Sequence, residues 1–409
     1  MPTENPYETL LTPADAAAVA EAVRDAGGKG LPVYPIGGGT TGGRRWLSPT
    51  MSENGETVAD NHLRPLPGIG ERGTVPLSPP GITLSTAKLN RLIDYPADDM
   101  TVTVEAGMTI GELNGRLAEK RQWLPVDVPF PDRATVGGAI ATNAAGPRQF
   151  AYGTMRDYLL GFTAVDGTGT IFSGGGRVVK NAAGYNMCRL MAGSRGTLGI
   201  ITQATLMVRP LPEASALLAC EVADFELAER LLASLVRLPV RPVAVELSAG
   251  RSHEGNPLFG PMLDGNVARL CVGFEGSNLE VEWMLGRLNK EWTALGMASP
   301  VMTPNLANDK LWRWIAEFPA DETINVLPSK LIETVAGLLK TSPDCAIRAR
   351  AGDGIIHVAR ARGDECPAAA STRRQIDGDG ALPPEIRVMR AIKERFDPMN
   401  ILNPGFVFA

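Results

Sequence analysis

Cysteine and histidine are scarce in this chain, and long apolar or basic runs are missing. The five cysteines are scattered and form no CxxC pair, which argues against an iron–sulfur cluster or zinc site within the chain and fits reduced cytosolic thiols. No segment approaches the ~18 uncharged apolar residues of a membrane span, and the N-terminus lacks the pattern of a signal peptide. A net charge of -5 without a Lys/Arg run argues against nucleic-acid binding.

What is present describes an ordinary globular protein. Hydrophobic residues make up 44% and charged residues 21% of the 409 residues, which is enough for a large core. The length suggests two or three domains.

The sequence of the first half of the chain predicts short helices and strands whose ends are marked by capping and turn residues. Thr12 and Pro13 predict a helix start, with Thr12 as the N-cap, and Thr109 and Glu112 have capping-box spacing. Residues 46–80 are rich in Pro, Gly, Ser and Asn without periodicity, which predicts a long surface insertion. Strands are expected at 31–36, 82–86, 101–105 and 198–208, with a hairpin turning at 166–168.

Pro210 and Pro212 end the first half, and a domain boundary is expected there. Alternating strands and helices follow, which predicts an α+β domain with its helices on one face of a sheet. The expected strands are 217–221, 243–247, 268–274, 346–349 and 354–359, and the expected helices are 225–236, 278–295, 308–318, 330–339 and 383–396.

Residues 37–42 satisfy GxGxxG, the pattern of a Rossmann dinucleotide loop. That motif requires a helix directly after it, but Arg44, Arg45 and Trp46 do not begin one. A glycine nest that binds an anion with successive N–H groups is the better interpretation. A flexible turn is the alternative.

Further glycine-dense segments lie at 134–146, 174–186 and 193–202. The stretch ATVGGAIATN within the first of them cannot fill a core, but it allows a large flat molecule to lie on the backbone. Each segment adjoins a predicted strand. Together they suggest one extended cofactor threaded among loops, and we expect a flavin, although close packing of a helix start would use similar residues.

Six motifs occur in an informative order: PIGGGT, ATVGGAIATNAAGP, YGTMRD, VVKNAAGYN, GSRGTLGIIT and FDPMNILNPG. This order resembles the vanillyl-alcohol oxidase/p-cresol methylhydroxylase (PCMH) flavoproteins, and within them most resembles the small FAD-binding (E) subunit of bacterial glycolate oxidase. The resemblance implies an α+β fold, with a two-subdomain PCMH-type FAD-binding domain at 1–212, an α+β cap or substrate domain at 213–382, and a C-terminal helix and tail at 383–409 that return to the FAD domain.

The resemblance also implies the cofactor site. The residues expected to bind FAD are Pro35, Ile36, Gly37, Gly38, Gly39, Thr40, Thr41, Thr135, Gly137, Gly138, Thr142, Asn143, Gly146, Tyr152, Gly153, Asp157, Lys180, Gly199, Ile200, Ile201 and Asn403. Relatives that attach flavin through histidine often place it directly after the glycine loop, where this chain has Thr40. Because His62 and His253 fall in predicted loops, we expect non-covalent FAD. Lys180 either lies near the N1/C2=O edge of the flavin or is a solvated loop lysine.

Oxidation of a 2-hydroxy acid needs a proton acceptor and a group that binds the carboxylate. Catalytic relatives resemble HxGDGNxH, whereas this chain has Arg350 at the first histidine position and His357 at the last. We expect no metal, because one imidazole is too few ligands. His357 is either a base or a hydrogen-bonded strand histidine, and Arg350 either binds a carboxylate or forms an ion pair in place of the lost ligand.

These observations support three hypotheses. The first is an FAD-dependent oxidoreductase subunit of a glycolate oxidase-like complex, which oxidises a 2-hydroxy acid or relays its electrons, with a catalytic flavin paralogue and an iron–sulfur subunit as partners. The second is a self-sufficient D-2-hydroxy-acid dehydrogenase of the D-lactate type, and the third is a non-catalytic FAD-binding structural subunit. A cytoplasmic location is expected, with at most peripheral association with the inner face of a membrane through partners.

Overall fold

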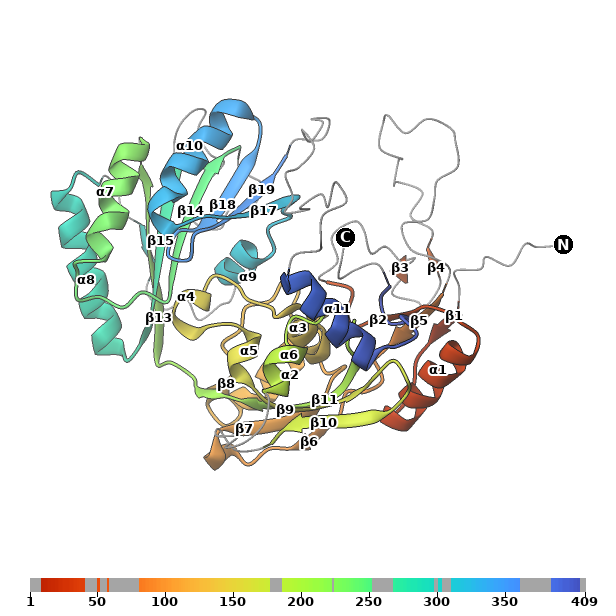
Figure 1. Ribbon diagram of the computed structural model, residues 1–409. Helices are drawn as coiled ribbons and strands as arrows, with labels where there is room; N and C mark the ends of the chain where they lie inside the picture. The colour runs from red at the N-terminus through yellow and green to blue at the C-terminus, as the bar shows by residue number, and fades with distance from the viewer. Residues whose placement is uncertain are drawn as a thin grey trace.

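The computed structural model describes residues 9–40, 50–51, 57–58, 81–176, 186–222, 224–251, 268–297, 301–303, 310–360 and 384–404. Two bodies of mixed helix and sheet are visible, one with α7, α8 and α10 and the other with α1, α2 and α11 (Figure 1). This agrees with the expected α+β class. The domain bounds drawn from the sequence stay a prediction.

A small parallel sheet begins the fold, with strand order β1-β5-β2. Its strands are β1 (Thr9–Leu11), β2 (Val33–Ile36) and β5 (Ile82–Ser85). Helix α1 (Ala16–Gly28) packs on it through Val19 and Val23. Asp15 caps this helix and accepts from Ala18 N at 2.8 Å, so the predicted start at Thr12 is wrong: Asp15, three residues further on, supplies the side-chain oxygen that N-capping requires.

The second sheet is antiparallel, in the order β10-β9-β11-β7-β6. Its strands are β6 (Leu92–Asp94), β7 (Thr101–Glu105), β9 (Leu159–Val165), β10 (Ile171–Gly175) and β11 (Ile200–Met207). The predicted hairpin at 166–168 is confirmed by pairing of β9 with β10. All five residues of β7 are buried despite their alternating pattern, because both faces of the strand are covered.

Short helices cover this sheet. Helix α2 (Ile110–Ala118) begins at the predicted cap Thr109, whose side chain accepts from Glu112 N at 3.1 Å. The others are α3 (Val136–Thr142), α5 (Met155–Tyr158) and α6 (Met187–Met191), whereas α4 (Gln149–Tyr152) lies against the cap sheet. Smaller elements are β8 (Gln122–Trp123), which pairs with β12 (Arg209–Pro210), and the 3-10 turns η2 (Ala97–Asp99) and η3 (Pro328–Lys330).

Most of the predicted insertion at 46–80 lies outside the described residues. The described parts are β3 (Thr50–Met51) and β4 (Thr57–Val58), which pair antiparallel.

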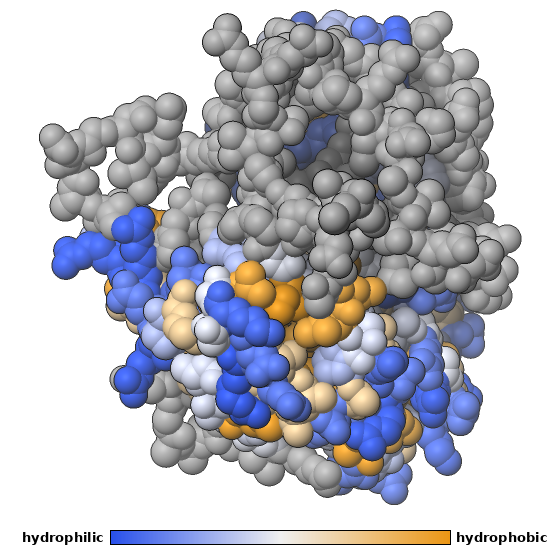
Figure 2. All heavy atoms as spheres, turned by 90° about the vertical axis from the view of Figure 1, so that its right-hand side faces the viewer, coloured by the Kyte–Doolittle hydropathy of each residue, from blue (hydrophilic) through white to orange (hydrophobic). Residues whose placement is uncertain are grey.

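On the side of the molecule where α1 lies, hydrophilic side chains are interspersed with small groups of apolar ones (Figure 2).

The cap sheet has the order β16-β13-β15-β14-β18-β19-β17, and all its neighbours pair antiparallel. Its strands are β13 (Ala214–Val222), β14 (Ala244–Gly250), β15 (Ala268–Gly276), β16 (Val301–Thr303), β17 (Glu322–Asn325), β18 (Ala346–Arg350) and β19 (Ile355–Ala359). The strands predicted in this half are confirmed, while the short strands β16 and β17 were not predicted.

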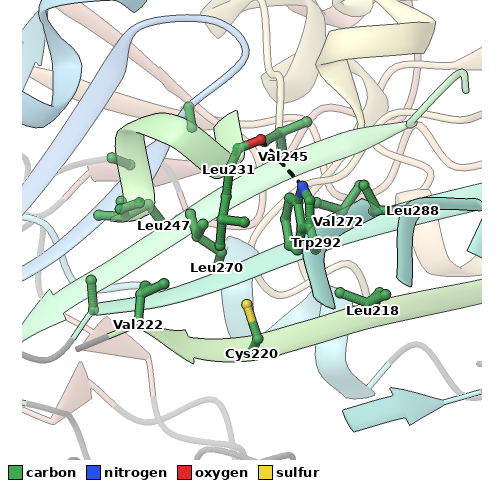
Figure 3. Close-up of a cluster of buried hydrophobic side chains, with 14 of the residues drawn as sticks. Leu218, Cys220, Val222, Leu231, Val245, Leu247, Leu270, Val272, Leu288 and Trp292 are labelled. Carbon is green, nitrogen blue, oxygen red and sulfur yellow. Dashed lines mark hydrogen bonds between the residues drawn. The ribbon is translucent and has the colours of Figure 1, made fainter. Parts of the chain in front are cut away.

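Three helices cover one face of the cap sheet: α7 (Phe225–Leu235), α8 (Asn278–Ala294) and α10 (Leu331–Thr341). Their core contains Trp292, whose indole N–H donates to Leu231 O at 3.2 Å (Figure 3). The same N–H also donates to Ser234 Oγ at 3.0 Å. The prediction that all helices share one face is wrong for α9 (Lys310–Ala316), which packs Trp312 and Ile315 on the opposite face.

The chain ends with α11 (Pro384–Phe396) and a tail that returns to β2. Lys393 is buried and donates to Thr197 O at 2.9 Å, Leu402 O at 2.7 Å and the Asp397 carboxylate. Asn403 N donates to Val33 O at 3.0 Å, which places the tail beside β2.

Candidate active site

The glycine loop after β2 lies directly on the start of α3. A Cβ on Gly37 would lie 2.1 Å from Thr135 Oγ1, and a Cβ on Gly38 would lie 1.6 Å from Arg133 O. Any side chain at Gly38 would therefore collide with backbone. Thr135 caps α3, and its hydroxyl accepts from Gly138 N at 3.2 Å.

The segment 193–197 and the tail close on the same place. Gly193 N donates to Ile140 O at 3.0 Å, and Arg195 N donates to Ala141 O at 2.7 Å. Asn403 donates its side-chain N–H to Arg195 O at 2.7 Å. Gly196 has φ +71, and a Cβ there would lie 2.7 Å from Pro35. The structure thus brings together the glycine loop, the small-residue stretch, the GSRGT loop and Asn403.

These residues fit a flavin nucleotide. The amides of Gly37, Gly38 and Gly39 make no hydrogen bond to other described residues, so they are available to a pyrophosphate. Ser194 Oγ and Asn403 Oδ1 are buried without a hydrogen-bond partner in the described part of the chain. Buried polar atoms of this kind normally have partners, and FAD would supply polar groups to them.

Other predicted cofactor residues have clear structural contacts. The Thr142 hydroxyl donates to Gly138 O at 2.8 Å, Asn143 has φ 50 and accepts from Arg156 N at 2.9 Å, and Asp157 accepts from Thr154 N at 2.8 Å. The predicted glycines pack closely against their neighbours. A Cβ would meet Ala106 at Gly137, Asp127 at Gly146, Asp157 at Gly153 and Val165 O at Gly199.

Ile200 and Ile201 are buried in two different hydrophobic clusters. Ile36 and Thr40 belong to β2 and the loop after it. Thr41 and Lys180 lie outside the described residues. Each of these FAD assignments stays a prediction.

Tyr152 points toward the cap. Its hydroxyl donates to Glu275 Oε2 at 2.8 Å, and its ring meets Trp123 edge-on at 5.6 Å between centroids. Burial, then the adjacent Glu275 carboxylate, raises the pKa of the Tyr152 phenol, which stays protonated. The side chain therefore contributes to the contact between the two bodies of the fold.

Arg148 is the centre of that contact. Its guanidinium donates to Asp127 Oδ1 at 2.8 Å through Nε and to Glu275 Oε1 at 3.0 Å through Nη1. It also lies over Trp123 at 4.6 Å and over Trp312 at 5.4 Å from the ring centroids. The three charged side chains are at most 10% exposed. Arg148, Asp127 and Glu275 were not predicted from the sequence, because partners so far apart in the chain leave no local pattern.

The cap sheet presents a polar face toward this contact. Val245, Leu247, Ile347, Ala349, Ile356 and Val358 face the helix-covered core. Because side chains alternate along a strand, Glu246, Arg348, Arg350 and His357 lie on the opposite face. Glu246 is the cross-strand partner of Arg350, and Arg348 is that of His357.

Arg350 reaches across to the end of the small-residue stretch. Its guanidinium donates to Ala145 O at 3.0 Å and to Gln149 Oε1 at 3.1 Å. Both acceptors are neutral, and among the described residues no carboxylate lies within ion-pair distance of Arg350. Its positive charge is therefore available to an incoming anion at the wall of the predicted flavin site.

His357 lies in a row with Arg348 and Thr323. Its Nδ1 is 3.0 Å from Thr323 Oγ1. Burial, followed by the charges of Arg350 and Arg348, lowers the pKa of His357 to about 4. The imidazole is neutral near pH 7, and both interpretations made from the sequence remain open on these contacts.

Two carboxyl groups near Arg350 were not predicted. Glu246 is 5% exposed, its Oε1 has no hydrogen-bond partner among the described residues, and burial raises its pKa to about 8. Asp353 also has a pKa raised by burial and an unpartnered buried Oδ2. The only local signal for Glu246 was an acidic residue inside the apolar strand AVELSAG.

Within the described ranges, no group of three or more His, Cys, Asp or Glu side chains is placed to hold a metal ion. None of the helices described by the structure is long and apolar enough to cross a bilayer.

Comparison with known proteins identifies two domain families. Residues 68–175 match the FAD binding domain, and residues 380–407 match the FAD linked oxidases, C-terminal domain. The second match contains α11 and Asn403.

Similar proteins share most of the chain at low identity. D-2-hydroxyglutarate dehydrogenase of Xanthomonas citri pv. viticola is 27% identical over 99% of this chain and 90% of its own length. D-lactate dehydrogenase of Archaeoglobus fulgidus is 29% identical over 97% of this chain and 90% of its own. Glycolate oxidase subunit GlcE of Escherichia coli is 28% identical over 80% of this chain and 88% of its own.

Solved structures of alkyldihydroxyacetonephosphate synthase share the fold. One has a TM-score of 0.66 at 17% identity and covers 97% of this chain and 75% of its own. A second crystal form has a TM-score of 0.67 at 19% identity.

Proposed function

Because the chain carries the FAD-binding domain and the C-terminal domain of FAD-linked oxidases, we propose that it oxidises a small 2-hydroxy acid with non-covalent FAD as the electron acceptor. The relatives named for D-2-hydroxyglutarate, D-lactate and glycolate support this substrate class. The observation that carries the proposal is the position of Arg350, a cap arginine whose hydrogen-bond partners among the described residues are both neutral and lie beside the small-residue stretch.

The chemistry requires a hydride to leave the substrate carbon and a proton to leave its hydroxyl. FAD supplies the hydride acceptor when bound. Arg350 would bind the substrate carboxylate through paired N–H···O bonds, which fix its orientation. In the tautomer whose Nδ1–H donates to Thr323, the Nε2 of His357 carries the lone pair that would accept the hydroxyl proton. Its low pKa makes it a weak base, so Arg350 is the stronger assignment.

We further propose that the protein works in the cytoplasm as one subunit of a glycolate oxidase-like complex, with a catalytic flavin paralogue and an iron–sulfur subunit as partners. Similarity to GlcE supports the subunit role. A self-sufficient D-2-hydroxy-acid dehydrogenase is the second candidate, supported by relatives of that name over nearly the whole chain.

The decisive experiment follows the flavin itself. The protein is purified with its FAD, made anaerobic, and mixed separately with glycolate, D-lactate and D-2-hydroxyglutarate. Loss of the visible flavin absorbance within seconds by one of them supports the proposed function. Tight FAD without bleaching by any substrate, even after addition of the co-purified partners, would instead support a structural role.

Two variants test the role of Arg350. Arg350→Met should lower kcat/KM by roughly 30- to 1,000-fold, because removing one partner of a desolvated charge pair costs about 2–4 kcal/mol. Arg350→Lys should recover only part of this, since lysine cannot form the bidentate contact. The matched control is Arg313→Met, another cap arginine that bonds to the FAD domain, at Asp132, but is 41% exposed. Equal effects at both positions would contradict the assignment.

A further inference from the structure

Glu246 is a buried carboxyl group to which the reaction just described assigns no role. It lies in the middle of β14, directly opposite Arg350 on β18. Directly opposed residues of antiparallel strands have Cβ atoms about 5 Å apart and side chains on the same face. Since Arg350 reaches Ala145 O and Gln149, Glu246 lies at the base of the same polar surface.

The carboxyl group has few partners for a group so buried. Its Oε1 has no hydrogen-bond partner in the described structure, and the side chain is 5% exposed. A buried oxygen of this kind costs about 1–3 kcal/mol, so a ligand that satisfies it gains affinity. The neighbouring Arg350 makes no ion pair with it among the described residues, which leaves both groups available.

The charged and titratable neighbours of Glu246 come from four segments. Arg350 and Arg348 lie on β18, Asp353 in the turn after it, Cys271 on β15, and Asp127 in the segment before α3. Burial outweighs the two arginines and raises the pKa of Glu246 to about 8. A carboxylic acid that stays neutral at pH 7 can donate a hydrogen bond.

From this geometry we propose that Glu246, in its protonated form, donates a hydrogen bond to the carboxylate of the substrate while Arg350 binds the same carboxylate. The inference rests on the proposed function and extends it to the specificity of the carboxylate site. No bond is formed or broken in this step. The proton remains on Glu246, and the complex contains one cation, one anion and one neutral donor.

A pH dependence follows. Below pH 8 Glu246 is protonated and donates, whereas above pH 8 it becomes an anion beside the bound carboxylate and repels it. A bound anion also favours the protonated form, so ligand binding in alkaline solution should draw a proton from solvent. A residue with a purely structural role in the cap would produce neither effect.

The test uses oxalate, a carboxylate ligand that has no C–H hydride to transfer, and the protein with FAD bound. Titration calorimetry measures its affinity from pH 6 to pH 9.5. The affinity should be constant up to about pH 7.5 and then fall roughly tenfold per pH unit above pH 8. Repeating the titration at pH 9 in two buffers of different ionisation enthalpy should show uptake of close to one proton per oxalate, and none at pH 6.

Two substitutions sharpen the result. Glu246→Gln keeps an N–H donor but cannot ionise, so it should bind oxalate within about threefold of the parent at pH 7 and lose the alkaline fall. Glu246→Leu removes the donor and should weaken binding roughly 10- to 100-fold at pH 7. If Glu246→Leu does not fold, the parent profile and Glu246→Gln decide the question by themselves.

The outcomes separate this inference from the proposed function. If oxalate fails to bind, or binds equally well to Arg350→Met, the carboxylate site itself is wrong and both proposals fall. If binding depends on Arg350 but the parent profile is flat to pH 9.5, only the role of Glu246 is wrong. An alkaline fall retained in Glu246→Gln would also overturn it.

Discussion

Arg148 should hold the FAD domain and the cap together, and its replacement by methionine tests this. The substitution keeps most of the apolar stem but removes the donors that bind Asp127 and Glu275. Those two carboxylates are 6% and 1% exposed, so water cannot readily replace the lost cation.

The expected loss in the free energy of unfolding depends on which hydrogen bonds Asp127 and Glu275 keep in the variant. Breaking a buried ion pair by removing one partner costs about 3–5 kcal/mol. Glu275 would keep the Tyr152 hydroxyl at 2.8 Å and the Ser215 hydroxyl at 3.2 Å, and Asp127 would keep the amide of residue 148 at 2.9 Å. These retained bonds place the cost near the lower end, about 3 kcal/mol, which corresponds to a fall in Tm of roughly 3–4 °C for a chain of 409 residues that unfolds as one unit.

Differential scanning calorimetry of the FAD-loaded protein measures this shift. The matched control is Arg91→Met, which breaks a pair with Glu105 in which the arginine side chain is 68% exposed. Exposed pairs contribute about 0.2–1 kcal/mol, so its Tm should fall by about 1 °C or less. Adding Glu275→Gln to Arg148→Met should recover part of the loss, because it removes one unpaired buried charge. Equal shifts for Arg148→Met and Arg91→Met, or further loss in the double variant, would refute the reasoning.

Two further predictions concern the histidine and the glycine loop. Because the pKa of His357 is lowered to about 4, between pH 6.5 and 4 the unfolded chain binds a proton that the folded chain does not. The free energy of unfolding should therefore fall by up to about 3 kcal/mol as pH decreases through this window. His357→Gln should reduce the Tm difference between pH 7 and pH 5. An unchanged difference would contradict the shifted pKa. Gly38→Ala should weaken FAD binding at least tenfold in an ultrafiltration assay, because its Cβ would lie 1.6 Å from Arg133 O. Gly28→Ala, where a Cβ meets nothing within 4 Å, is the control that should leave FAD affinity unchanged.

The sequence predicted the local elements well because their signals are local. The cap Thr109, the hairpin at 166–168 and the helix at 384–396 follow from capping, turn and periodicity rules that act within a few residues. The first helix shows the limit, since capping rules predicted a start at Thr12 and Pro13, whereas Asp15 caps the helix in the structure. The glycine segments likewise indicated an extended cofactor, because glycine marks places where something approaches the backbone closely.

The sequence by itself therefore determined most of the elements and the cofactor class. It also determined that the histidine set of catalytic relatives is incomplete here, with Arg350 and His357 at the ends of the motif. Only the tertiary structure decided which side chains meet. Strand register places Glu246 opposite Arg350, and docking of the cap places Arg350 on Ala145 O, 205 positions away in the chain. Register and docking result from the burial of whole sheet faces, so no residue pattern within a single segment encodes them.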